Sequence, residues 1–300
     1  EQRAFWHSER VKHEEFHLGA RTILDQAGLH AFVEPRYIWT ICVDAATQRN
    51  FLLPKFQFRA PKVFAQRPFY SYKLMATYAY GYGFTPFLVP SSQKMGANLT
   101  WTVIWITLCA MHDHYGYWPE VIHLQLDNTK GENKNEVMAM LSAWIASTKV
   151  KVVRVFFLPV GHTHIIIDQI FGVITVGLRR RELLTPGDLV RNIEGTLAEN
   201  PDYMAKPVQT LYCLWDFTSW ARSQIKIDPR LQRLFGGKVQ DDVGSYTGMY
   251  DFQFKRVDDG NFCRLWYREH PSHPYWPSSG QGAIVILGLP TSPPPYQEVK

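Results

Sequence analysis

The stretch Val121-Ile-His-Leu-Gln-Leu-Asp127-Asn128 decides the fold, because it combines a strand pattern with a carboxylate at its end. Three aliphatic residues alternate with three polar ones, which is the two-residue period of a β-strand with one apolar and one polar face. A carboxylate beside a buried strand is costly unless a cation, a hydrogen bond or a raised pKa offsets its desolvation. Asp127 is therefore a candidate functional residue.

Two other acidic residues stand in comparable places. Asp44 ends the apolar strand predicted over 37–44, and Asp168 lies near the start of a helix that follows the strand predicted over 152–158. Parallel strands place their carboxyl ends at one edge of a sheet, where open α/β sheets bind ligands. We expect Asp44, Asp127 and Asp168 to converge there and to hold two divalent cations about 3.5–4 Å apart. Oxygen ligands favour Mg²⁺ or Mn²⁺.

Composition sets the class of protein but not its chemistry. A chain of 300 residues with 46% hydrophobic and 14% aromatic residues can bury a large core. The formal net charge of +5 fits a polyanionic partner, although many ordinary enzymes share it. The most apolar helical stretch, 99–111, is too short to span a bilayer, so no membrane partner is expected.

The cysteines do not form a recognisable site in the sequence. They lie far apart within apolar segments, without the paired spacing of structural zinc or a redox dithiol. We expect reduced core residues of an intracellular protein at the four positions Cys42, Cys109, Cys213 and Cys263.

The pattern along the chain divides it into five parts. The central part follows the order strand, hairpin, helix, strand, helix, strand, helix, and its second helix is predicted over 132–147. The predicted parts are an N-terminal helical segment (1–36), an α/β core (37–185), an irregular or helical connector (186–244), a small C-terminal β module (245–290) and a tail (291–300).

This order of elements resembles the ribonuclease H-like core of DDE-type transposases and retroviral integrases. The blocks Gln125-Leu-Asp-Asn128 with Glu132-Asn-Lys-Asn135, and Phe157-Leu-Pro-Val-Gly-His-Thr-His164 with Asp168-Gln-Ile-Phe171, resemble transposon-derived integrase-like domains of eukaryotes. The resemblance implies an α/β fold with a ribonuclease H-like mixed sheet flanked by helices. It also implies Mg²⁺- or Mn²⁺-dependent cleavage or strand transfer of DNA, a nuclear location and, as an open alternative, homo-oligomers.

The resemblance also implies roles for particular residues. Asp44, Asp127 and Asp168 would be both the catalytic residues and the metal ligands. Supporting roles at the site are expected for Asn128, Glu132, Asn135, His162 and His164. Catalysis could also have been lost, which would leave a domesticated domain that binds DNA or protein through the same fold.

Ordinary structural explanations exist for the same residues. Asp44 could end a strand at a turn, and a carboxylate at the position of Asp168 is favoured by the helix dipole alone. Asp127 could begin a turn into a helix that a capping box of Thr129 and Glu132 starts.

The two histidines have an alternative reading of their own. His162 and His164, followed by Asp168, could bind one zinc ion in a hydrolase, although the sequence identifies no further ligand. The run Arg179-Arg-Arg181 is typical of a helix C-terminus, and contact with a DNA backbone is its alternative role.

Overall fold

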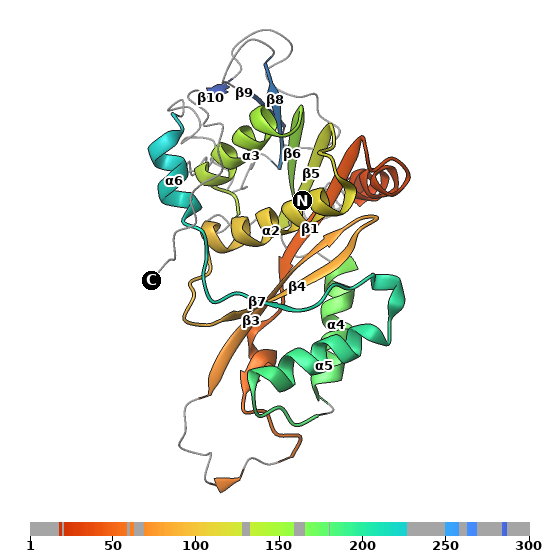
Figure 1. Cartoon of the computed structure of the whole chain (residues 1–300). Coiled ribbons are helices and arrows are strands. Elements are labelled where there is room, and N and C mark those ends of the chain that lie inside the picture. Colours follow the sequence, from red (N-terminus) through yellow and green to blue (C-terminus); the bar gives the residue numbers. More distant parts are fainter. Residues whose placement is uncertain are drawn as a thin grey trace, which may run out of the picture.

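The structure is a computed structural model of the whole chain. It describes residues 18–19, 21–58, 61–62, 69–127, 133–158, 166–179, 181–226, 250–257, 263–268 and 284–286. Within these ranges the protein is an α/β fold with one mixed sheet flanked by helices (Figure 1), as the sequence predicts. None of the described helices is long and apolar enough to cross a membrane.

The sheet has ten strands in the order β10-β9-β8-β6-β5-β1-β3-β4-β7, and β2 pairs with β3 beside this path. Strands β5 and β6 run parallel to β1, whereas β3 and β8 run antiparallel to their neighbours β1 and β6. The bounds are β1 Ile38–Ala45, β2 Leu52–Leu53, β3 Tyr70–Ala79, β4 Gly83–Pro90, β5 Val121–Asp127, β6 Val152–Leu158, β7 Gln209–Thr210, β8 Asp251–Arg256, β9 Cys263–Arg268 and β10 Ile284–Ile286.

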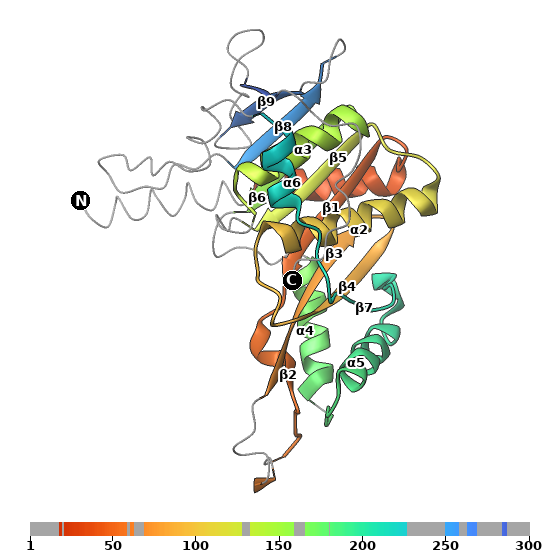
Figure 2. The ribbon, with the colours of Figure 1, turned by 60° about the vertical axis from the view of Figure 1, so that its left-hand side comes forward.

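The helices lie on both faces of this sheet (Figures 1 and 2). A helix over residues 21–33 precedes β1. The others are η1 Gln48–Phe51, α2 Ala97–Tyr115, α3 Glu136–Thr148, α4 Ile166–Arg179, α5 Pro186–Ala198, η3 Pro201–Tyr203 and α6 Phe217–Gln224.

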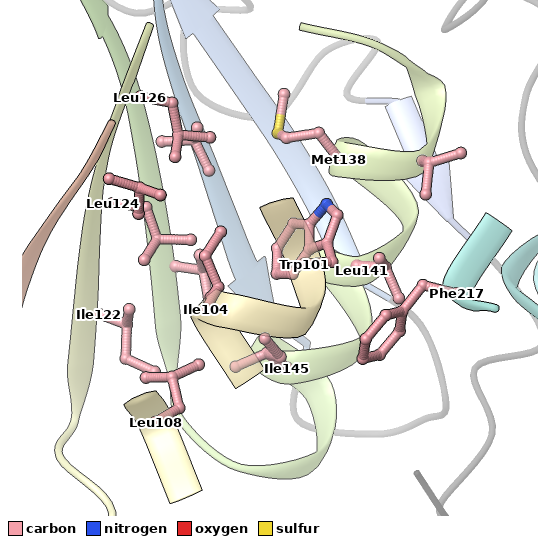
Figure 3. Close-up of a cluster of buried hydrophobic side chains, with 14 of the residues drawn as sticks. Trp101, Ile104, Leu108, Ile122, Leu124, Leu126, Met138, Leu141, Ile145 and Phe217 are labelled. Atoms are coloured by element: carbon pink, nitrogen blue, oxygen red, sulfur yellow. The ribbon is translucent and has the colours of Figure 1, made fainter. Parts of the chain in front are cut away.

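One face of the sheet packs against α2, α3 and α6. Leu124 and Leu126 of β5 meet Ile104 of α2 and Leu141 of α3 there, and Phe217 of α6 lies at the outer side of the cluster (Figure 3). The odd-numbered residues of β1 and the even-numbered residues of β5 face this core. The polar residues that alternate with them in the sequence therefore face the other side.

The other face carries the 21–33 helix, α4 and α5. The Thr40 hydroxyl of β1 donates a 2.8 Å hydrogen bond to the carbonyl of Ala27, which fixes the 21–33 helix on this side. The helical spacing of apolar residues around Asp168 predicts one apolar face with five members. The structure confirms it, because these are the five buried residues of α4: Ile167, Ile170, Phe171, Ile174 and Leu178.

Two predicted helix boundaries are wrong. The mixture of charged and apolar residues from Glu1 onward predicts one amphipathic helix that ends at about Gly28, but the helix continues to residue 33. The helix predicted to begin at Glu132 begins at Glu136 instead, because the side chain of Asn135 accepts a 3.1 Å hydrogen bond from the Met138 amide and caps that end.

The segment after residue 186 contains more regular structure than its prolines suggest. Pro186 stands at the start of α5, where its missing N–H costs nothing. Thr185 and Asp188 form a capping box ahead of it, with each side chain bonded to the backbone of the other residue.

The strands of the predicted C-terminal β module are present, but they are not separate from the core. β8 pairs with β6, and β9 and β10 follow, so all three extend the main sheet. The turn signal Asp258-Asp-Gly260-Asn261 predicts a hairpin within this module, and the pairing of β8 with β9 confirms it. The turn itself, at 258–262, lies outside the described residues. The run Val152–Leu158 is almost continuously apolar, as expected of a strand with neighbours on both sides.

Candidate functional site: three carboxylates at one sheet edge

Asp44 and Asp127 lie level on adjacent parallel strands. Cys42 is paired with Gln125, so Asp44 on β1 and Asp127 on β5, each two residues further on, stand side by side. Neighbouring strands are about 4.8 Å apart, and residues at the same level point to the same face. Both side chains therefore leave the sheet on the face that carries α4, at the carboxyl end of their strands.

Asp168 reaches the same place from the first turn of α4, which packs against β1 and β3. The buried side of α4 holds the helix on the sheet, and Asn50 donates a 3.4 Å hydrogen bond to the Thr175 hydroxyl further along it. Asp168 lies close enough to Asp44 for its charge and a side-chain hydrogen-bonding interaction to raise the pKa of Asp44. The common metal site of the three aspartates stays a prediction.

The pKa of Asp44 is raised to about 7, mainly because the carboxyl is buried. The charges of Asp168 and Asp127 raise it further, whereas a 2.7 Å hydrogen bond from the Ala45 amide lowers it. At neutral pH the Asp44 carboxyl is therefore close to half protonated. Like charges this close favour either a shared proton or a cation.

The donor set fits a hard divalent cation, because all three side chains are carboxylates. Within the described ranges, no three His, Cys, Asp or Glu side chains are already close enough together to hold a metal ion. The charges of Asp127 and Asp168 nevertheless raise the pKa of Asp44, so both carboxylates lie near it.

The predicted supporting residues have different outcomes. Asn135 caps α3, as described above, so a structural role accounts for its side chain. Asn128, Glu132, His162 and His164 lie outside the described residues. Their roles, including the zinc alternative, stay predictions.

A buried ion-pair cluster lies on the carboxylate face and was missed by sequence reasoning. Asp251 of β8 is fully buried and accepts two hydrogen bonds from Arg154, of 2.9 and 2.6 Å. Arg268 of β9 adds a third bond of 2.6 Å. These contacts hold the pKa of Asp251 below its usual value although burial opposes them. The cluster joins β6, β8 and β9 beside the strand that carries Asp127.

Two buried polar residues on β5 lie between this cluster and β1. His123 is level with Arg154, and burial together with the Arg154 charge lowers the pKa of its imidazole to about 3. Among the residues that the structure describes, neither ring nitrogen of His123 has a hydrogen-bond partner, nor does Oε1 of Gln125. The alternation in β5 predicts this polar face, whose members are His123, Gln125 and Asp127.

A cleft of about 480 Å³ lies between α4 and α5. Gln169 and Gly172 begin its α4 side within one turn of Asp168, and Glu199 and Asn200 close the α5 side. The lining of the cleft thus begins next to Asp168 in the sequence, and none of the three aspartates is part of that lining.

The comparisons with known proteins identify a family and nothing more specific. Neither the comparison with curated proteins nor that with solved structures finds a match. A family model described as "Domain of unknown function (DUF7869)" matches residues 77–234, a span that includes Asp127 and Asp168 and begins after Asp44. Because this match covers more than half of the 300 residues, the chain belongs to the DUF7869 family.

Proposed function

We propose that the chain is a ribonuclease H-like polynucleotidyl transferase or nuclease that cleaves or joins DNA strands with two Mg²⁺ or Mn²⁺ ions. The observation that carries the proposal is the level placement of Asp44 and Asp127 together with the influence of Asp168 on the pKa of Asp44. The order strand, hairpin, helix, strand, helix, strand, helix also agrees with the transposase and integrase resemblance.

Each aspartate has a distinct part in this proposal. Asp44 and Asp127 are held by the central strands and form the rigid side of the site, while Asp168 comes from α4. Because the pKa of Asp44 is about 7, its carboxyl releases its proton readily when a cation approaches at neutral pH. When bound, the two cations would activate a water or a DNA 3′-hydroxyl and stabilise the departing oxygen.

The proposal is tested by nicking of supercoiled plasmid DNA in the presence of Mn²⁺ or Mg²⁺. We expect Asp127→Asn and Asp168→Asn to reduce nicking to background, since each removes one ligand charge without changing side-chain size. Asp113→Asn is the matched control, because its carboxylate is 84% exposed at the end of α2. Nicking by Asp127→Asn at the wild-type rate would contradict the proposal, and so would nicking that persists in EDTA.

The alternative is a catalytically silent domain that binds DNA through the same fold. Calorimetric titration with Mn²⁺ separates the two readings. Heat of binding that disappears in Asp127→Asn supports the enzyme. DNA binding without measurable uptake of Mn²⁺ supports the silent domain.

A further inference from the structure

The charges of the chain are segregated along its sequence. Residues 45–112 contain seven Lys and Arg residues and not one Asp or Glu. The whole chain has 32 basic and 27 acidic residues, so the other 232 positions contain 25 basic and 27 acidic residues. All of the net positive charge therefore comes from the segment that builds η1, β2, β3, β4 and most of α2.

Part of this segment projects beyond the carboxylates. Ala76 of β3 is paired with Asp44, and the strand extends a further six residues from there to Tyr70. At about 3.4 Å per residue this is about 20 Å. β2 pairs with this outer part of β3 (Figure 2). We call the described residues 52–58 and 69–72, together with Tyr212, the arm.

The arm carries large exposed rings. The exposed fractions are 79% for Phe58, 74% for Tyr70, 50% for Phe69 and 64% for Tyr212. Tyr72 is paired with Pro90, and β7 runs beside β4 just before Tyr212, so Tyr72 and Tyr212 lie at the same end of the sheet. The pKa of Tyr72 is raised by burial and by the neighbouring Tyr212 and Tyr70, which agrees with one cluster of tyrosines.

The rings and the carboxylates share one face. Tyr70 and Tyr72 stand at even positions of β3, like Ala76, and Tyr72 and Ala76 both belong to the core under α4 and α5. Asp44 also leaves the sheet on this side. From Tyr72 inward this side of β3 is covered by α4 and α5, so the exposed rings of the arm lie beyond the covered part of the face.

Basic side chains accompany the rings. The Lys55 backbone pairs with Leu183 just after α4. The pKa of the Lys55 ammonium is lowered mainly by burial and also by the charge of Arg179 at the end of α4. Lys62 is exposed. Cationic groups interleaved with flat rings, with no acidic residue nearby in sequence, match the backbone charge and the base faces of a single strand.

We propose that the arm is a binding surface for single-stranded nucleic acid, on which bases stack against Tyr70 and Tyr212 while the lysines contact phosphates. Stacking is tolerant of sequence, so the arm binds without strong base preference. That the bound strand is also the substrate of the aspartates rests on the proposed function. The binding itself does not require the metal chemistry.

The test measures binding of the full chain to a fluorescein-labelled 20-nucleotide oligothymidylate by anisotropy in EDTA. We expect Tyr70→Ala and Tyr212→Ala each to raise the Kd about tenfold, which is the usual cost of losing one stacked base. Lys62→Gln should flatten the slope of log K against log salt by about 0.7. Phe32→Ala is the matched control, because its ring is 65% exposed and lies beside Gly81, at the opposite end of β3. We expect it to bind like the wild type.

Three results would overturn this proposal. The first is equal affinity of wild type, Tyr70→Ala and Tyr212→Ala for the oligonucleotide. The second is binding to vesicles containing phosphatidylserine but not to the oligonucleotide, which would make the arm a membrane surface. The third is a self-associating wild type that Tyr70→Ala makes monomeric. Repeating the binding with Asp127→Asn separates the two proposals, because loss of nicking with unchanged binding leaves the arm supported.

Discussion

Replacing Asp44 with asparagine should stabilise the protein at alkaline pH in the absence of divalent cations. The folded state raises the pKa of this carboxyl from 3.8 to about 7, chiefly by burial. Below pH 4 the group is protonated in both the folded and the unfolded chain, so it costs nothing. Between pH 4 and 7 the unfolded chain releases the proton while the folded chain keeps it, so the free energy of unfolding falls as pH rises. Above pH 7 the loss is complete.

The size of the effect follows from the shift. Roughly three pKa units correspond to about 4 kcal/mol, an upper figure because water and local relaxation screen part of it. Asparagine keeps the oxygen that accepts from Ala45 and offers an N–H to Asp168, so it imitates the protonated acid at every pH. The difference in unfolding free energy between Asp44→Asn and wild type should grow from near zero at pH 4 toward this value at pH 8.5.

Urea unfolding in EDTA, followed by tryptophan fluorescence at several pH values, measures this difference directly. Asp113→Asn removes an exposed carboxylate and should show no such pH dependence. The unfolding free energy of Asp44→Asn could instead stay within about 0.5 kcal/mol of the wild-type value from pH 4 to 8.5. In that case burial and the acidic neighbours do not destabilise the ionised Asp44 carboxylate, and the prediction is wrong.

Three further changes probe the fold by urea unfolding. Asp251→Ala should cost about 3–5 kcal/mol, since it leaves two guanidinium groups without their buried partner, and a loss under 1 kcal/mol would contradict that role. Leu124→Ala should cost about 2–5 kcal/mol by opening a cavity in the central strand, whereas the exposed Leu29→Ala should cost little. Gly83→Ala should cost about 2 kcal/mol or more, because φ is +121° and the new methyl would overlap the Met204 carbonyl; a neutral result would refute this.

The sequence was most informative where local periodicity and burial agree. The alternation in β5 correctly assigned Asp127 to the polar face, and the spacing in α4 identified all five of its buried residues. Both patterns are local, because each residue is placed by its own strand or helix. The start of α3 was misplaced since Thr129, Glu132 and Asn135 all offer plausible capping chemistry within one stretch.

Long-range pairing was beyond local patterns. Arg154 and Asp251 are 97 positions apart, and only the register of β8 against β6 brings them together. For the same reason the C-terminal hairpin could be predicted but its attachment to β6 could not. The nearly unbroken apolar run of β6 was the available signal, because an edge strand would alternate more.

The position of β1 in the middle of the sheet has a practical consequence for anyone who wishes to express this domain. Boundaries taken from the family match at 77–234 would cut β3 at Thr77 and discard the strand that joins β5 to β3. Such a fragment would also end before β8 and uncover the backbone groups of β6, inviting aggregation. A soluble recombinant product should instead begin ahead of β1 and continue past β10.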